Sequence, residues 1–124
     1  MTKPFYKSKA WKRKRAKILR RDEYMCQESK RYGKTVPATT IHHVYQIEYY
    51  PELALEDWNL ISLCETQHNA MHDRVSHQVT ELGEQWQERL KHHFDSFYQR
   101  QNEVGEDDDN IRMQRVNHYS ATTR

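Results

Sequence analysis

Four of the chain's eight histidines lie between residues 39 and 74, as an adjacent pair, His42 and His43, and a spaced pair, His68 and His72. On a helix, the spaced pair would share one face about one turn apart and could hold one ion together, although such a pair alone is more often two solvated surface histidines. On a strand, neighbouring residues point to opposite faces, so only one of His42 and His43 can join that metal site. The other is free to accept a proton, because imidazole has a reference pKa of about 6.5.

Three imidazoles with an open coordination position are typical of a catalytic metal site. A ligand set made only of nitrogen favours Zn²⁺, Ni²⁺ or Co²⁺. Mg²⁺ prefers oxygen, but phosphate oxygens of a DNA substrate and water would supply that ligand type and make Mg²⁺ or Mn²⁺ usable. The histidines therefore predict one divalent ion and leave its identity open.

Two strands and a helix are expected to position these histidines. The segment TIHHV is rich in β-branched residues and predicts a strand, and the alternation in NLISLC predicts a second one. Between them, Pro51 occupies a plausible first helical position of a short helical turn in PELALEDW. The pattern from Glu65 to about Val75 is helical and would carry His68 and His72 on one face.

Further elements flank this region. Ser8 can cap a helix over residues 9–23, in which Trp11, Ile18 and Leu19 form a narrow apolar stripe. A turn-rich loop follows, with a short strand expected at residues 24–26. A long C-terminal helix is predicted from apolar residues at three- and four-residue spacing, which are Val79, Leu82, Trp86, Leu90, Phe94 and Phe97.

Composition limits the class of protein. A chain of 124 residues with 35% hydrophobic residues suits one domain with a small core. It has no run of the roughly 18–20 apolar residues that a membrane span needs, and no apolar signal core follows the basic N-terminus. Two cysteines are too few for a disulfide scaffold. We therefore expect a soluble, intracellular protein with no membrane partner.

The order of the polar residues resembles that of the HNH endonucleases, also called ββα-metal or His-Me finger nucleases. The resemblance lies in His42-His43, in Asn59 within WNL, and in CETQHNAMH, and it covers about residues 8–75. The HH and His-x3-His form is similar to the colicin DNases, whereas CQESKRYGK, IHHV and NLISLCETQHNAMHDR are similar to small HNH endonucleases of bacteriophages. The fold expected is α+β and mainly helical, with a ββα-metal core, a basic N-terminal helix and a long C-terminal helix.

This resemblance implies a role for each polar residue. His42, His68 and His72 would hold the metal ion, which could be Mg²⁺, Mn²⁺, Ni²⁺ or Zn²⁺. His43 would be the general base that takes a proton from water, and Asn59 would orient the His43 segment without binding metal. The implied activity is metal-dependent hydrolysis of DNA phosphodiester bonds, leaving 5′-phosphate and 3′-hydroxyl ends.

The chain departs from the commonest HNH pattern at its cysteines. Many members hold a structural zinc with two Cys-x2-Cys pairs, but the matching positions here read Cys26-x2-Ser29 and Cys64-x2-Gln67. Two thiolates alone are a poor ligand set for a closed tetrahedral Zn²⁺. We therefore expect no structural zinc and interpret Cys26 and Cys64 as small buried residues, which as remnants of a zinc site could lie close enough for a disulfide to form on oxidation.

The expected organisation is a flexible N-terminus at residues 1–7, a single HNH nuclease domain at 8–100, and an acidic, disordered tail at 101–124. Residues 1–21 carry ten cations and no acid, which suits a phosphate backbone but is also common on solvated helix faces. The residues expected to contact DNA phosphates are Lys12, Arg13, Arg15, Arg20 and Arg74. Such contacts position the duplex and read no sequence.

The expected partner is double-stranded DNA, bound by a monomer or weak dimer. The phage resemblance further suggests DNA processing or packaging in the cytoplasm of a bacterial host, together with the large terminase subunit. Two other readings remain open. A noncatalytic DNA-binding module with a structural metal would have little use for His43, and a toxin-like DNase would need a delivery domain or export signal that the sequence does not show.

Overall fold

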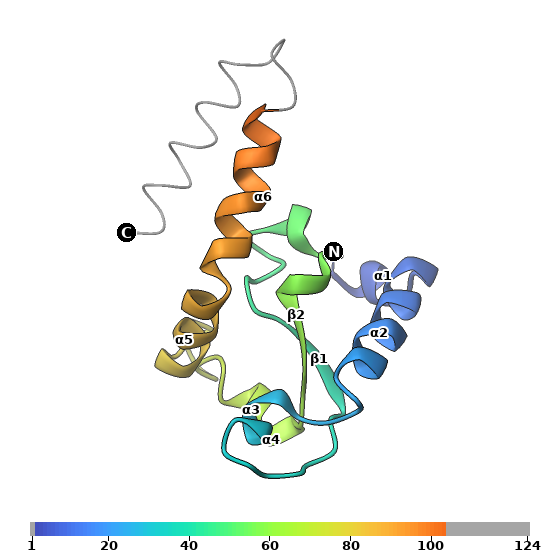
Figure 1. Ribbon diagram of the computed structural model, residues 1–124, viewed down its shortest axis with the longest axis vertical. Helices are drawn as coiled ribbons and strands as arrows, with labels where there is room; N and C mark the ends of the chain where they lie inside the picture. The colour runs from blue at the N-terminus through green and yellow to red at the C-terminus, as the bar shows by residue number, and fades with distance from the viewer. Residues whose placement is uncertain (1, 104–124) are drawn as a thin grey trace. The chain divides into compact units, whose positions relative to one another are not determined.

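The computed structural model describes residues 2–103, which divide into two compact units, one ending at Arg89 and the other beginning at Leu90 (Figure 1). The first unit contains, in chain order, α1 (Thr2–Lys7), α2 (Lys9–Arg21), α3 (Gln27–Lys30), β1 (Thr40–His43), the 3₁₀ turns η1 (Pro51–Leu53) and η2 (Asp57–Asn59), β2 (Leu60–Leu63), α4 (Glu65–Asn69) and α5 (Glu81–Arg89). The second unit contains α6 (Lys91–Glu103). This confirms the predicted α+β, mainly helical class.

The two strands form an antiparallel pair and confirm both strand predictions. His42 lies opposite Ile61, and His43 lies opposite Leu60. All four residues of β2 are buried, as are the last three of β1. The sheet therefore lies inside the unit, and side chains on both of its faces need packing partners.

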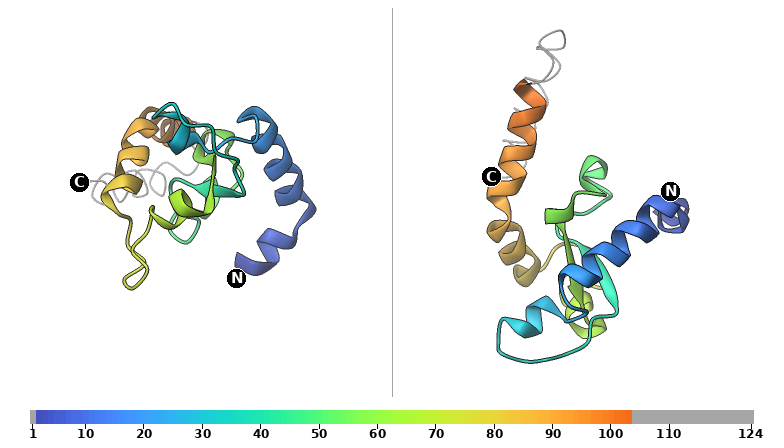
Figure 2. Two further views of the ribbon diagram at one scale, coloured as in Figure 1. Left: turned by 90° about the horizontal axis from the view of Figure 1, so that it is seen from below. Right: turned by 45° about the vertical axis from the view of Figure 1, so that its right-hand side comes forward.

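Helix α2 packs against both strands of this sheet (Figures 1 and 2). The predicted Ser8 cap is confirmed, since the Ser8 hydroxyl oxygen accepts a hydrogen bond from the Trp11 amide at 3.1 Å. The predicted stripe is confirmed too, because its three residues join two sheet residues in one buried cluster, made of Trp11, Ile18, Leu19, Ile41 and Leu60. Helix α1 lies before the cap, in the segment expected to be flexible.

The helix predicted from Glu65 to about Val75 is shorter than expected. It ends at Asn69, and His72 lies beyond it in a hairpin, bridged to Val79. The Asp73 carboxylate accepts hydrogen bonds from the amides of Val75 and Ser76, which stabilises a turn in place of a further helical turn. The prediction that His68 and His72 share one helix face is therefore wrong.

Two other expectations also change. The strand expected at residues 24–26 is reduced to a single bridge between Met25 and Pro37. The apolar stripe expected in one long C-terminal helix is divided among three segments: Val79 lies in the bridge before α5, the next residues lie in α5, and the last ones lie in α6 after a turn at Leu90. Helix α6 includes the first residues of the segment expected as an acidic tail, and residues 104–124 lie outside the described part of the chain. None of the helices in residues 2–103 has both the length and the apolar character needed to cross a lipid bilayer.

Candidate active site

Three imidazoles meet at one end of the sheet. The His42 ring centre lies 5.3 Å from that of His68 and 5.4 Å from that of His72. They line a cavity of about 220 Å³ together with His43, and Tyr6 and Glu48 contribute to the same wall. The structure thus brings together all four histidines that the sequence singled out.

The separations of the His42 ring from the two other rings fit a shared metal ion. An imidazole nitrogen binds Zn²⁺ at about 2.0–2.1 Å, so two rings at a tetrahedral angle have centres about 5 Å apart. Both measured separations from His42 agree with this value. The ring nitrogens do not yet converge, since no three His, Cys, Asp or Glu side chains among residues 2–103 are already arranged to hold an ion. His68 and His72 are only half-buried, so rotation of their rings about the side-chain bonds would bring the nitrogens toward a shared ion.

His72 reaches this cavity through the hairpin and not through α4. The Thr80 amide donates to the Met71 carbonyl at 2.9 Å, and the Thr80 hydroxyl donates to the Ala70 carbonyl at 2.6 Å. Gly83 in α5 packs directly on this segment, where an added Cβ would lie only 2.7 Å from the Met71 carbonyl oxygen. The absence of a side chain at residue 83 therefore permits the close approach of α5 that supports His72.

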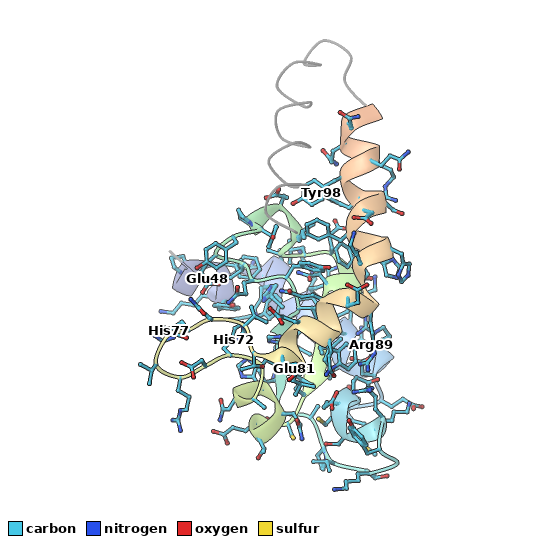
Figure 3. The ribbon with its side chains drawn as sticks, turned by 90° about the vertical axis from the view of Figure 1, so that its left-hand side faces the viewer. Glu48, His72, His77, Glu81, Arg89 and Tyr98 are labelled. Carbon is cyan, nitrogen blue, oxygen red and sulfur yellow. The ribbon has the colours of Figure 1, made fainter. Side chains whose placement is uncertain are left out.

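Burial keeps the three imidazoles neutral. Desolvation, with smaller effects from His68 and His72, holds the His42 pKa well below its usual range. Burial also lowers the pKa of His68, and that of His72, where Glu48 partly opposes the shift. Figure 3 shows Glu48 and His72 on the same side of the first unit. Neutral imidazole is the form that binds a metal ion, so the cavity favours ligation without prior loss of protons.

His43 has different surroundings, although it borders the same cavity. Its Nε2 lies 3.0 Å from the Ala54 carbonyl oxygen, and its ring stacks on the Trp11 indole. A carbonyl oxygen can only accept, so Nε2 must carry the proton and Nδ1 is left with a free lone pair. Burial lowers the His43 pKa, while the Ala54 hydrogen bond and Glu48 act in the opposite direction. A buried, neutral His43 with one free nitrogen can take a proton from water.

Asn59 fixes the chain that follows His43. Its side chain is fully buried and its Oδ1 accepts a hydrogen bond from the Tyr45 amide at 2.7 Å. Its Nδ2 donates to the carbonyls of Tyr45 at 3.1 Å and Leu53 at 3.2 Å. One amide therefore ties the end of β1 to η1, next to the Ala54 carbonyl that holds His43.

The two cysteines lie close together. Cys26 is buried and Cys64 is half-buried, and neither is in a disulfide. Burial raises the pKa of the Cys26 thiol, but hydrogen bonds involving Ser29 and Cys64 outweigh this effect, and the net shift is downward. The place where relatives would hold zinc thus contains two thiols and a hydroxyl group.

Three cations of α2 form ion pairs with carboxylates of the protein. Lys14 and Lys17 both pair with Asp57, which lowers the pKa of that carboxyl group, and Arg21 donates to Asp22 and to the Leu60 carbonyl. The predicted DNA contacts lie elsewhere. All five of these side chains are exposed, namely Lys12, Arg13, Arg15, Arg20 and Arg74, and Arg15 also donates to the Thr39 carbonyl at 3.2 Å.

Three residues of the site were not identified from sequence. Trp11 was assigned only to the core, Tyr6 lay in the segment expected to be flexible, and Glu48 was not singled out. No local pattern marks Tyr6 or Glu48, because they reach the cavity through tertiary packing. Trp11 lies about one turn into a capped helix, where a large aromatic side chain needs a packing partner. This position was the available sequence signal for its contact with the site.

Comparison with solved structures supplies the family. The chain is similar to the HNH endonuclease of the deep-sea thermophilic bacteriophage GVE2, whose crystal structure contains a manganese ion, with 32% sequence identity and a TM-score of 0.54. The match covers 55% of this chain and 74% of that protein. No protein-family model and no curated protein matches the chain. Because the identity and coverage accompany a two-stranded sheet whose four histidines line one cavity, we conclude that the chain belongs to the HNH endonucleases.

Proposed function

We propose that this enzyme hydrolyses DNA phosphodiester bonds with one divalent metal ion held by His42, His68 and His72. The observation that carries the proposal is the meeting of His42 with both other imidazoles at ring separations suited to a shared ion, beside a histidine outside that set. The manganese ion in the phage GVE2 enzyme supports a divalent cofactor. Mg²⁺, Mn²⁺, Ni²⁺ and Zn²⁺ are the candidates, since substrate oxygens and water would complete the ligand set.

His43 is proposed as the general base. Its Nδ1 takes a proton from water, which then attacks the scissile phosphorus, and its Nε2 keeps the hydrogen bond to the Ala54 carbonyl throughout. When bound, the divalent ion supplies Lewis-acid polarisation of a phosphate oxygen and stabilises the charge on the departing 3′ oxygen. Attack on phosphorus breaks its bond to the 3′ oxygen, which then takes a proton from solvent water, so the products carry 5′-phosphate and 3′-hydroxyl ends.

Asn59 acts in this proposal by position and not by contact with the reacting atoms. Its three hydrogen bonds hold Tyr45, two residues after His43, and Leu53, directly before Ala54. The backbone on which the base and its carbonyl partner lie therefore keeps one arrangement. Preorganisation of this kind lowers the cost of reaching the transition state.

We further propose that duplex DNA docks along the exposed cations, which are Lys12, Arg13, Arg15, Arg20 and Arg74. Their exposure, together with the internal pairing of Lys14, Lys17 and Arg21, leaves the first set available to phosphates. We also propose a role in phage DNA processing or packaging in the bacterial cytoplasm, with the large terminase subunit as a partner; the support for it is that the similar enzyme comes from a bacteriophage.

The test is cleavage of supercoiled and linear DNA in EDTA and in each of the four metal ions. Three variants accompany the wild type: His43→Ala, His68→Ala and, as a matched control, His92→Ala at an exposed histidine of α6. We expect His43→Ala to bind Mn²⁺ in calorimetry without cutting, His68→Ala to lose both properties, and the control to behave as wild type. Cleavage by His43→Ala at the wild-type rate would refute its role as base.

A further inference from the structure

The general-base histidine lies flat against an indole ring. The His43 and Trp11 ring centres are 5.2 Å apart, and the ring planes differ by 22°. Both residues are almost inaccessible, with 6% and 5% of their surface exposed. Phe5 and Tyr6 of α1 approach the same imidazole at 6.1 and 6.2 Å, at steeper angles. His43 is therefore surrounded by aromatic rings, of which Trp11 alone stacks on its face.

The stack and the Ala54 carbonyl restrain the imidazole in different directions. The hydrogen bond at 3.0 Å fixes which nitrogen points toward η1, but a ring held by one bond can still tilt about it. A flat indole against one face prevents that tilt, because rotation of the ring would bring its atoms into the indole. Together the two contacts hold the imidazole of this cavity-lining residue in a single orientation.

We propose that Trp11 is a positioning residue for catalysis, which holds the His43 ring in one orientation beside the cavity. The inference rests on the proposed function, in which His43 is the general base. It goes beyond packing, because Leu19 lies in the same helix and the same buried cluster but offers no ring to His43. A residue needed only for the core would affect folding and leave the chemical step alone.

The experiment compares Trp11→Leu, Trp11→Phe, Leu19→Ala and His43→Ala with the wild type, at a temperature where each is folded. The measurements are kcat and KM for cleavage of a short duplex in Mn²⁺, the Mn²⁺ affinity by calorimetry, and the midpoint of thermal unfolding by circular dichroism. We expect Trp11→Leu to lower kcat about tenfold with KM and Mn²⁺ affinity unchanged. Trp11→Phe should restore most of that loss, and Leu19→Ala should lower the unfolding midpoint without changing kcat.

A spectroscopic measurement on the wild type tests the geometry without any substitution. Long-range ¹H–¹⁵N spectra of metal-free protein should show His43 protonated at Nε2 and unprotonated at Nδ1, and this tautomer should lose its dominance in Trp11→Leu. A wild-type His43 protonated at Nδ1 would overturn the inference even if Trp11→Leu failed to fold. An unchanged kcat in folded Trp11→Leu would overturn it as well.

The variants distinguish a failure of this inference from a failure of the proposed function. If His43→Ala cuts DNA at the wild-type rate, the base assignment is wrong and the role of Trp11 falls with it. If His43→Ala is inactive while Trp11→Leu and Leu19→Ala have equal kcat values, His43 remains the base and only the role of Trp11 is refuted.

Discussion

Asn59→Ala should be among the most destabilising substitutions in the first unit. The change removes three hydrogen bonds, at 2.7, 3.1 and 3.2 Å, made by a side chain with no exposed surface. Each such bond contributes about 1 kcal/mol net, and the groups of Tyr45 and Leu53 left buried without a partner cost more. Summed over three bonds, we expect a loss of about 3–5 kcal/mol in the free energy of unfolding, a large share of the roughly 5–15 kcal/mol of a typical domain.

Urea denaturation followed by circular dichroism measures this loss. Asn59→Asp is the informative companion, because a carboxylate still accepts from the Tyr45 amide but cannot donate to the Tyr45 and Leu53 carbonyls. Gln85→Ala, which removes an exposed amide from α5, is the matched control and should change stability by less than about 0.5 kcal/mol. A loss below about 1 kcal/mol for Asn59→Ala would show that the amide does not hold the end of β1.

Three further outcomes follow from the geometry. Gly83→Ala should weaken Mn²⁺ binding in calorimetry without abolishing folding, because its methyl group must displace the Met71 carbonyl and the hairpin that carries His72; an unchanged affinity would contradict this. In EDTA, the free energy of unfolding should fall as the pH drops from about 7 through about 6.5, since the lowered His42 pKa means that the unfolded chain binds more protons there; urea titrations across this range test the sign. Replacing Lys12 and Arg13 by Gln should reduce the slope of log affinity for duplex DNA against log salt by about two, and an unchanged slope would place docking on another surface.

Local sequence patterns predicted the elements that depend on local forces. The β-branched run before His42, the alternation after Asn59 and the Ser8 hydroxyl each describe structure decided within a few residues, and all three elements form where expected. The end of α4 could not be predicted from local sequence. The Asp73 turn and the bridge to Val79 compete with the helix only when the hairpin forms. The helical spacing therefore correctly predicted that His68 and His72 lie in one site, although a hairpin and not a shared helix brings His72 there.

The sequence predicted which histidines form the candidate site, but it did not predict the residues that hold them in place. Which groups surround His43 depends on how α1, α2 and η1 pack on the sheet, and no spacing in the sequence states that the Ala54 carbonyl or the Trp11 indole will meet it. The break at Leu90 is of the same kind, because the apolar spacing continues across it although the helix does not. Periodicity reports a buried face and does not report whether one helix or two provide it.

Because His42 and His43 are adjacent in the chain, partial unfolding should affect them less than it affects His68 and His72. The proposed metal ligand and the proposed base are joined by one peptide unit, whose Cα atoms are held about 3.8 Å apart by covalent geometry. Their mutual distance therefore persists as long as β1 stays extended, whatever happens to the packing around it. His68 and His72 have no such covalent link to β1 and depend on α4, the hairpin and Gly83. On heating, we therefore expect His68 and His72 to separate from His42, and a bound ion to be lost, while β1 still holds His42 and His43 next to each other.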